Sequence, residues 1–346
     1  MRKLFCVLLI LALVLAGSAC AREEEPPVAP VAPVVPALHV SGGTLVDEAG
    51  QPVALRGMST HGLGWYPRYI NAAAMQTLKE YGANVLRLAL YSETKAGYLE
   101  EPYSLDMLYI AIENAIAQDL YVIVDWHILS DSNPLTHVEA AEEFFAQISR
   151  HYAGVPNVLY EICNEPNGDT GWEDIAAYAD RIIPVIRENA PEAVVLVGTP
   201  KYSTQIQEAM AQPLPYENLM YSYHKYIDVS PGGEEASLYW LEKALAAGFP
   251  VFVTEWGIQY EDFTDGQQEE ALLLEQYQAL DMAPAQAFVD FMNQNGLSWC
   301  GWALSNSVEI HGAIRWDCDK LHGWVQDDLT PGGALMFSSF QGEVSA

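Results

Sequence analysis

The sequence has 346 residues, half of them hydrophobic, and a formal net charge of −30 with an isoelectric point near 4.3. Nucleic acid and anionic membrane surfaces would repel such an acidic chain, so neither is expected as a partner. The length and the apolar fraction are sufficient for one large core, which allows a single barrel domain or two smaller domains.

The N-terminus has the pattern of a targeting segment. Arg2 and Lys3 precede an apolar stretch, residues 4–15, that is too short to span a bilayer in the mature protein, and small residues then lead to Cys20. We expect a signal peptide over residues 1–19 that is cleaved before Cys20, in the manner of a bacterial lipoprotein, so that Cys20 carries a lipid anchor at the cell surface. Ordinary cleavage near Cys20 followed by secretion is the alternative, and both predict export.

A proline-rich segment follows the predicted cleavage site. Residues 20–37 alternate Pro with Val and Ala, which predicts an extended spacer without a core of its own. The remaining residues, 38–346, are expected to form one catalytic domain.

Apolar runs of strand length alternate with helical patterns from residue 54 onward. The runs are rich in β-branched residues and apolar on both faces, as in parallel strands that helices cover. We expect strands at 54–59, 84–90, 121–126, 158–162, 193–197, 219–223, 251–254 and 298–303. We expect helices at 71–81, 105–118, 138–152, 171–189, 203–211, 234–247 and 269–295, with a last short helix at 333–340.

Eight strands that alternate with helices predict an α/β fold of the (β/α)₈ type, a TIM barrel. An open doubly wound sheet is the alternative, but no Gly-rich dinucleotide-binding loop follows the first strand. Cys163 and Cys300 lie in strand-like runs and are interpreted as small buried side chains. The sequence also allows a disulfide between Cys300 and Cys318.

Polar and aromatic residues gather where the predicted strands end. In a barrel these ends meet on one face, which is where active sites lie. The residues are His61, Trp65 and Tyr66 after the first strand, Arg87 in the second, His127 after the third, Asn164 and Glu165 after the fourth, His224 and Tyr226 after the sixth, Glu255 after the seventh, and Trp302 in the eighth.

Two of these residues, Glu165 and Glu255, predict a reaction. Cleavage of a glycosidic bond needs one carboxyl group that protonates the leaving oxygen and a second that attacks the sugar or activates water. Strands four and seven face each other across a barrel, so the carboxyl groups can approach to roughly 5–5.5 Å, the separation typical of retaining enzymes. A solvated strand-end glutamate is the alternative for Glu165 taken alone.

The other residues would serve this pair or the sugar. The positive charge of Arg87 would keep the nucleophile ionised, Asn164 would bind a sugar hydroxyl, and Trp65, Tyr66 and Trp302 offer flat faces for pyranose rings. Arg87 as a structural ion-pair partner, and His127 and His224 as buried core histidines, are the alternatives. A metal site would need more ligands than His61 provides after the first strand, so neither a metal nor a cofactor is expected.

Several strings resemble glycoside hydrolase family 5, in particular its bacterial endo-β-1,4-glucanases. The resemblance covers about residues 39–340. The strings are Leu55–Leu63, Trp65–Pro67, Val124–Ser130, Val158–Asn167, Thr254–Gly257 and Leu297–Trp299.

The resemblance implies a retaining endo-β-1,4-glucanase in which Glu165 is the acid/base and Glu255 is the nucleophile. It places Arg87, His127, Asn164, His224, Tyr226 and Trp302 around the sugar whose bond is cleaved, and His61, Trp65 and Tyr66 on the glycone side. The sequence departs from this branch at Ser307, where a sugar-binding Lys is usual. The acidic segment 258–281 is longer than expected and predicts a helix beside the cleft.

The expected partner is therefore a β-glucan chain, bound by a monomer. A mannan, xyloglucan, lichenan or chitosan cleaved by the same mechanism is the first alternative. A non-catalytic glucan-binding surface lipoprotein is the second, and the presence of both glutamates disfavours it.

Overall fold

The computed structural model describes residues 35–93, 95–232, 236–260 and 270–341. The predicted signal peptide, the lipidation site at Cys20 and most of the proline-rich spacer lie outside these residues. No helix among the described residues has the length and apolar character needed to cross a bilayer.

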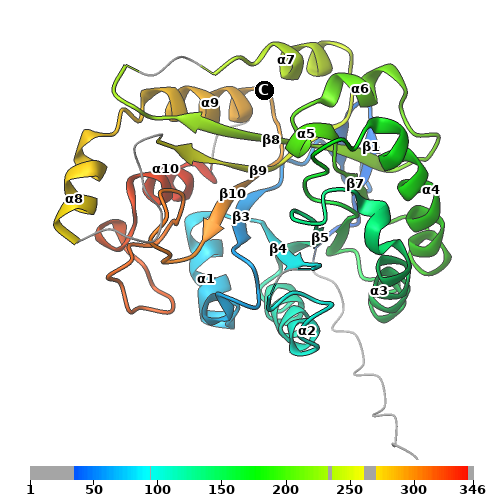
Figure 1. Cartoon of the computed structure of the whole chain (residues 1–346), viewed down its shortest axis with the longest axis horizontal. Coiled ribbons are helices and arrows are strands. Elements are labelled where there is room, and N and C mark those ends of the chain that lie inside the picture. The colour runs from blue at the N-terminus through cyan, green and yellow to red at the C-terminus, as the bar shows by residue number, and fades with distance from the viewer. Residues whose placement is uncertain (1–34, 94, 233–235, 261–269, 342–346) are drawn as a thin grey trace, which may run out of the picture. The chain divides into compact units, whose positions relative to one another are not determined.

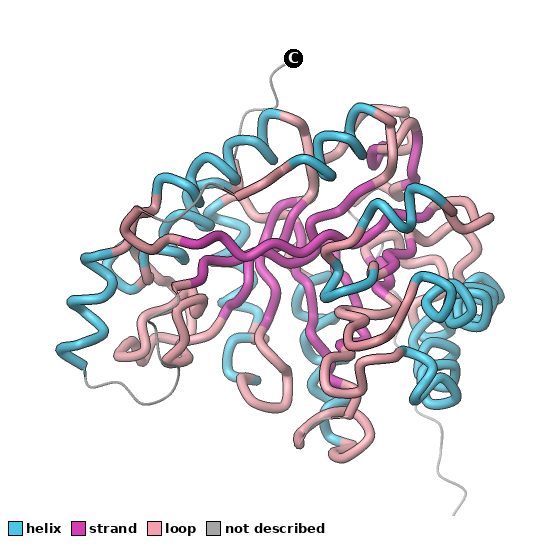
Figure 2. The backbone as a smooth tube through the Cα atoms, turned by 45° about the horizontal axis from the view of Figure 1, so that its top comes forward, coloured by secondary structure: helices cyan, strands magenta, loops and turns pink. Residues whose placement is uncertain are grey.

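The described residues contain a closed barrel of eight parallel strands, which confirms the predicted (β/α)₈ fold. The strand order around the barrel is β10-β3-β4-β5-β6-β7-β8-β9, and helices surround it (Figures 1 and 2). The strands are β3 (Arg56–Thr60), β4 (Val85–Tyr91), β5 (Tyr121–His127), β6 (Val158–Glu161), β7 (Val195–Val197), β8 (Leu219–Asp228), β9 (Val251–Gln259) and β10 (Trp299–Leu304).

Helices follow the strands in the order expected of a β/α barrel. They are α1 (Ala72–Tyr81), α2 (Tyr103–Ile116), α3 (Val138–His151), α4 (Trp172–Asn189), α5 (Pro200–Ser203), α6 (Ile206–Ala211), α7 (Tyr239–Ala246), α8 (Glu270–Ala279), α9 (Ala283–Gln294) and α10 (Pro331–Ser339). Short 3₁₀ helices occur at η1 (Pro67–Tyr69), η2 (Pro134–His137) and η3 (Gln326–Asp328).

Local sequence explains where several helices begin and end. The side chain of Asn71 accepts a hydrogen bond from the backbone of Ala74 and caps α1, and Gly82 ends that helix with a φ of 102°. Thr330 caps α10 in the same way, with Pro331 in the first turn.

One predicted helix is divided in the structure and another is shorter than expected. The predicted helix 269–295 forms two helices, α8 and α9. The chain breaks between them because the backbone N–H of Asp281 donates to the carbonyl of Val229, and α9 then begins with Pro284 in its first turn. The predicted helix 203–211 is α6 alone, because Lys201, Tyr202 and Ser203 before it all have positive φ.

A short N-terminal hairpin was not predicted. Its strands, β1 (His39–Ser41) and β2 (Thr44–Val46), are too short to show a periodic pattern. The backbone N–H of Val40 bonds to Asn218 just before β8, and Leu38 and Leu45 pack against apolar side chains inside the barrel. The hairpin therefore closes the end of the barrel at which the strands begin.

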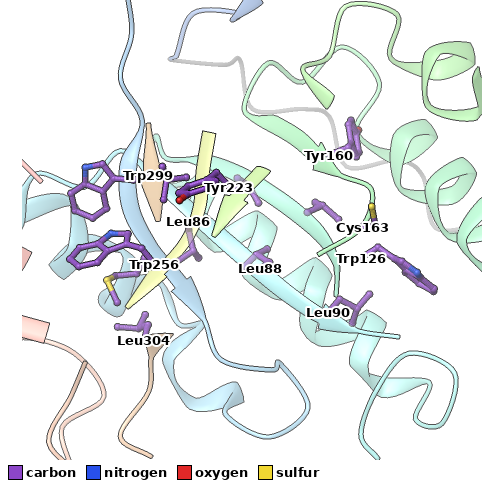
Figure 3. Packing of buried hydrophobic residues seen from close by; sticks show 14 of the residues in the cluster. Leu86, Leu88, Leu90, Trp126, Tyr160, Cys163, Tyr223, Trp256, Trp299 and Leu304 are labelled. Atoms are coloured by element: carbon purple, nitrogen blue, oxygen red, sulfur yellow. The ribbon is translucent and has the colours of Figure 1, made fainter. Parts of the chain in front are cut away.

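Side chains alternate along each strand between the barrel interior and the surrounding helices. On β4, Leu86, Leu88 and Leu90 point to the same side, into the layer between barrel and helices (Figure 3). Val85 and Arg87 point into the barrel instead. The same alternation on β5 places Asp125 inside the barrel, next to Arg87. The barrel interior is therefore apolar at the end where the strands begin and polar toward the end where they finish.

The three cysteines among the described residues, Cys163, Cys300 and Cys318, are free thiols. Cys163 and Cys300 are fully buried, as predicted, and the disulfide between Cys300 and Cys318 is not formed. Cys300 packs inside the barrel, whereas Cys318 belongs to the outer core and lies 3.8 Å from Asp328, so the two thiols lie in different layers.

Candidate active site

Glu165 and Glu255 lie together above the barrel. Glu255 belongs to β9, and Glu165 follows the end of β6 by four residues. Their carboxylate oxygens and a ring nitrogen of His224 all lie within 4.8 Å of one another. The structure thus brings the two predicted glutamates close together.

Glu165 has surroundings that favour its protonated form. Its Oε1 lies 2.8 Å from Nδ1 of His224, and its side chain is only 12% exposed. Burial raises the pKa of Glu165 to about 7, with Asp125 and Glu161 adding to the effect and Arg87 opposing it. The carboxyl group can therefore hold a proton near neutral pH.

Glu255 has surroundings that favour its ionised form. Nη1 of Arg87 donates to its Oε2 at 3.0 Å, and the hydroxyl of Tyr226 donates to its Oε1 at 2.8 Å. Charge-assisted hydrogen bonds of this kind stabilise a carboxylate and fix its orientation. The two glutamates thus differ in the way that acid and nucleophile must differ.

Arg87 is the centre of the polar layer inside the barrel. Its Nε lies 2.6 Å from Oε2 of Glu161, and its Nη2 lies 2.7 Å from Oδ1 of Asn164 and 3.0 Å from Oδ2 of Asp125. Burial alone would lower the pKa of Arg87, but the three carboxylates around it raise that pKa well above its usual value. Arg87 is therefore always charged.

Two of the buried histidines, His127 and His224, have surroundings that favour the neutral ring. Burial lowers the pKa of His224 to about 4, and burial together with Arg87 lowers the pKa of His127 well below its usual value. Nε2 of His224 lies 2.9 Å from Oγ1 of Thr254, and Nδ1 of His127 lies 2.6 Å from Oδ2 of Asp125. Each ring is thus held in place from two sides.

A cavity of about 310 Å³ opens over the two glutamates. It is lined by His61, Trp65, Tyr91, His127, Leu129, Glu165, Tyr226, Glu255, Trp302, Glu309 and His311. The rings of His127 and Trp302 stack at 5.3 Å, and Trp65 remains 42% exposed at the rim. Flat aromatic faces and carboxylates therefore share one opening.

Four of the predicted site residues do not line this cavity. Arg87 and Asn164 are fully buried, His224 is buried beside Glu165, and Tyr66 packs against His61 at 4.6 Å. The side chain of Asn164 bonds to Arg87 and to the backbone of Ile128. Trp256 and Trp299 belong to the core.

Sequence reasoning missed one acidic side chain in the cavity. Oε2 of Glu309 lies 3.2 Å from Nε2 of His61 and 3.3 Å from Nε2 of His311, and it accepts a hydrogen bond from Ser307. Burial would raise the pKa of Glu309, but the hydrogen bonds from His311 and His61 lower it well below its usual value. The only signal in the sequence was the position of Glu309, two residues after Ser307, which stands where the family usually has a Lys.

Two groups of described residues could supply ligands to a metal ion. Glu165, His224 and Glu255 form one, and the more exposed Glu93, Asp131 and His137 form the other. In the first group Glu165 and His224 bond to each other and Glu255 bonds to Arg87, so these contacts suit acid/base and nucleophilic chemistry as they stand.

A second, larger cavity lies at the opposite end of the barrel. Its volume is about 740 Å³, and it lies between the N-terminal hairpin and residues just before β8 and β9. Its acidic side chains, Glu48, Glu192 and Glu217, face no lining Arg or Lys. This cavity therefore lacks a carboxylate pair like that of Glu165 and Glu255 at the other end of the barrel.

A parallel β/α barrel with two closely spaced carboxyl groups that have different hydrogen-bond partners, set among aromatic rings, is the arrangement of a glycoside hydrolase. The family model described as cellulase (glycosyl hydrolase family 5) matches residues 46–308. The chain belongs to this family.

Curated relatives carry the same assignment. Endoglucanase A of Butyrivibrio fibrisolvens is 40% identical over 300 residues, which cover 85% of this chain and 66% of that protein. The endoglucanase of Clostridium saccharobutylicum is 37% identical over 308 residues, which cover 88% of this chain and 65% of that protein. The chain thus spans just under two thirds of the length of these relatives.

Solved structures agree with the fold. The catalytic domain of Thermobifida fusca endoglucanase Cel5A superposes with a TM-score of 0.76 at 33% identity, covering 88% of this chain and 97% of that one. A variant of the same domain was solved in complex with cellotetraose. A thermostable, halotolerant cellulase from an Icelandic hot spring isolate has a TM-score of 0.77 at 34% identity, covering 90% of this chain and 96% of that one.

Proposed function

We propose that the chain is a retaining endo-β-1,4-glucanase that cleaves internal bonds of a β-glucan. The observation that carries this proposal is the carboxylate pair within 4.8 Å, one member buried beside a neutral histidine and the other bonded to Arg87 and Tyr226. Inverting enzymes need a wider gap, roughly 6.5–9.5 Å, to admit water between the carboxyl groups.

The reaction follows from the two environments. Glu165 gives its proton to the glycosidic oxygen while the carboxylate of Glu255 attacks the anomeric carbon, which releases the aglycone and leaves a covalent glycosyl-enzyme. Glu165, now ionised, takes a proton from water, and the hydroxide formed displaces Glu255 from the anomeric carbon. Both steps invert the configuration, so the product retains it.

The surrounding residues are assigned to the substrate. Trp302, His127 and Tyr226 line the cavity around the sugar that is cleaved, with Arg87, Asn164 and His224 behind them. His61, Trp65 and Tyr66 form the glycone side. The endoglucanases among the relatives and the cellotetraose complex support a β-1,4-glucan over the other β-glycans.

Replacement of the nucleophile tests the assignment. Glu255→Gln should abolish turnover of carboxymethylcellulose and keep the affinity for cellotetraose, whereas the exposed control Glu93→Gln should hydrolyse like the wild type. Equal hydrolysis by wild type and Glu255→Gln would reject the nucleophile. An inverted anomer in the initial NMR spectrum would reject the retaining mechanism.

The preferred polysaccharide is tested by a panel of substrates. We expect faster release of reducing ends from carboxymethylcellulose than from mannan, xyloglucan, lichenan or chitosan. Faster turnover of mannan or chitosan than of carboxymethylcellulose would leave the proposed mechanism in place but would change the assigned substrate.

The N-terminal sequence supports export and anchoring through Cys20. We also propose that the protein is a monomer. Labelled palmitate should be incorporated, Cys20→Ala should abolish incorporation, and globomycin should block processing. Incorporation that survives Cys20→Ala would reject the anchor. Size-exclusion chromatography of the Cys20→Ala variant, which lacks the proposed anchor, tests whether the protein is a monomer.

A further inference from the structure

Glu161 is a fully buried acid that does not line the cavity. It ends β6, four residues before Glu165, and points into the barrel interior. Its Oε2 lies 2.6 Å from Nε of Arg87, and its Oε1 accepts a hydrogen bond of 2.6 Å from Ser222 on β8. The family's cleavage reaction, as assigned above, makes no direct use of it.

We propose that Glu161 is a positioning residue for the reaction: it fixes the Arg87 guanidinium so that Nη1 faces Glu255, and its charge balances Arg87 beneath the cleft. The inference rests on the proposed roles of Glu165 and Glu255. Glu161 itself touches neither the cavity nor the substrate.

Geometry supports the orienting role. A guanidinium is a planar fork, so the direction of one N–H fixes the directions of the others. Glu161 holds Nε at 2.6 Å, and this leaves Nη1 to reach Glu255 at 3.0 Å and Nη2 to reach Asn164 at 2.7 Å. Because Ser222 on β8 anchors the other oxygen of Glu161, one chain of contacts leads from β8 through Glu161 and Arg87 to Glu255 on β9.

Charge supports the balancing role. A single positive charge on Arg87 faces three carboxylates, those of Asp125, Glu161 and Glu255, inside the barrel. Without Glu161, more of that positive charge would act on Glu165. The negative charge of Glu161 is among the causes that raise the pKa of Glu165, and Arg87 opposes it.

The titratable groups that face this centre come from the barrel strands and the residues just after them. They are Arg87 and Tyr91 on β4, Asp125 and His127 on β5, Cys163 and Glu165 after β6, His224 and Tyr226 on β8, Glu255 on β9 and Cys300 on β10. Among these, the histidines stay neutral and Arg87 stays charged through the range in which Glu165 titrates. Burial raises the pKa of Asp125 to about 7 as well, so the Glu165→Gln variant described below is needed to assign the basic limb of the pH profile to Glu165.

The test is the pH dependence of kcat for Glu161→Gln on a cello-oligosaccharide. Gln keeps the size and can still accept from Ser222 but has no charge, so we expect the basic limb to move to lower pH by about one unit while KM changes little. Ser222→Ala is the matched control: it removes a hydrogen bond and keeps the charge, so its basic limb should stay where the wild-type limb lies. A basic limb of Glu161→Gln that coincides with the wild type would overturn the proposal.

A second variant keeps the test informative if Glu161→Gln does not fold. Glu161→Asp keeps the charge but withdraws it from Nε of Arg87, so kcat should fall while the basic limb stays in place. Wild-type kcat in Glu161→Asp would overturn the orienting role.

Failure of the proposed function has a different signature. In Glu165→Gln, an aryl cellobioside with a good leaving group needs no proton, so its cleavage should lose the basic limb. If the limb survives in that variant, Glu165 is not the acid, and the result bears on the proposed function and not on Glu161.

Discussion

At the scale of single residues, the two catalytic candidates are chemically alike and are distinguished by their neighbours. Both side chains are largely cut off from water, but Glu165 lies beside a neutral histidine, whereas Glu255 accepts hydrogen bonds from Arg87 and Tyr226. Burial disfavours the charged form of a carboxyl group, and a nearby cation favours it. The division of roles thus comes from β4 and β8, which supply these neighbours.

The pKa of Glu165 predicts a pH dependence. Its value in the folded protein is raised to about 7, so the proton needed by the leaving group is present below that pH and is lost as the pH rises through it. We expect kcat/KM on a cello-oligosaccharide to fall above about pH 7. A rate that stays level up to pH 9 would contradict the role of Glu165 as acid.

The hydroxyl of Tyr226 should contribute directly to the rate. A hydrogen bond to a charged group is worth about 1.5–3 kcal/mol, so Tyr226→Phe should lower kcat/KM roughly tenfold to a hundredfold. Tyr239→Phe is the control, because that side chain is 54% exposed on α7. Equal loss in both variants, measured by steady-state kinetics at one pH, would argue against a specific contact with Glu255.

At the scale of elements, the Glu165 loop is held by close backbone packing. Gly198 follows β7, and a Cβ added there would lie 2.4 Å from the carbonyl oxygen of Cys163 and 3.0 Å from that of Asn164. Ser203, in the turn after Gly198, donates to the same Asn164 carbonyl. The position of Glu165 therefore depends on β7 and its following turn as well as on β6.

This packing predicts the effect of one methyl group. Gly198→Ala should destabilise the protein by about 1–3 kcal/mol through overpacking and should lower kcat because the Glu165 loop is displaced. Gly171→Ala is the matched control, since a Cβ at Gly171 would meet nothing within 4 Å. Thermal unfolding and kinetics of both variants provide the measurement, and equal behaviour would contradict the packing argument.

The elements could be predicted where one periodic pattern dominates. The eight barrel strands and the helices α1 to α4 were expected within a few residues, because apolar runs and amphipathic stretches alternate strictly there. The hairpin β1–β2 and the break between α8 and α9 depend on single contacts with distant segments, such as Val40 with Asn218 and Asp281 with Val229. No local pattern encodes such contacts.

The residues of the site could likewise be predicted only where the local sequence marks them. Glu165 and Glu255 stand in strings that resemble the family, and Arg87 is a charged residue in an apolar predicted strand, whereas Glu161 and Glu309 were missed because their roles depend on partners far away in the sequence. Arg87 is 74 residues from Glu161, and His61 and Glu309 belong to opposite ends of the chain. Only the closed barrel makes them neighbours.

At the scale of the whole molecule, the net charge of −30 should oppose folding. Like charges repel one another more in the compact state, and salt shortens the range of this repulsion from about 30 Å at 0.01 M to about 8 Å at 0.15 M. We expect the melting temperature at pH 7 to rise by several degrees between these salt concentrations. A melting temperature that falls with sodium chloride would indicate that attractive ion pairs dominate.

The N-terminal hairpin also sets a direction. The described chain begins beside the starts of the barrel strands, where the hydroxyl of Tyr121 donates to the carbonyl of Pro36 and Leu38 packs into the barrel interior. The carboxylate pair lies at the other end of the same strands. The described chain therefore enters the domain at the end of the barrel opposite the carboxylate pair, and an anchor at Cys20, as proposed, would leave the mouth of the barrel accessible to a polymeric substrate.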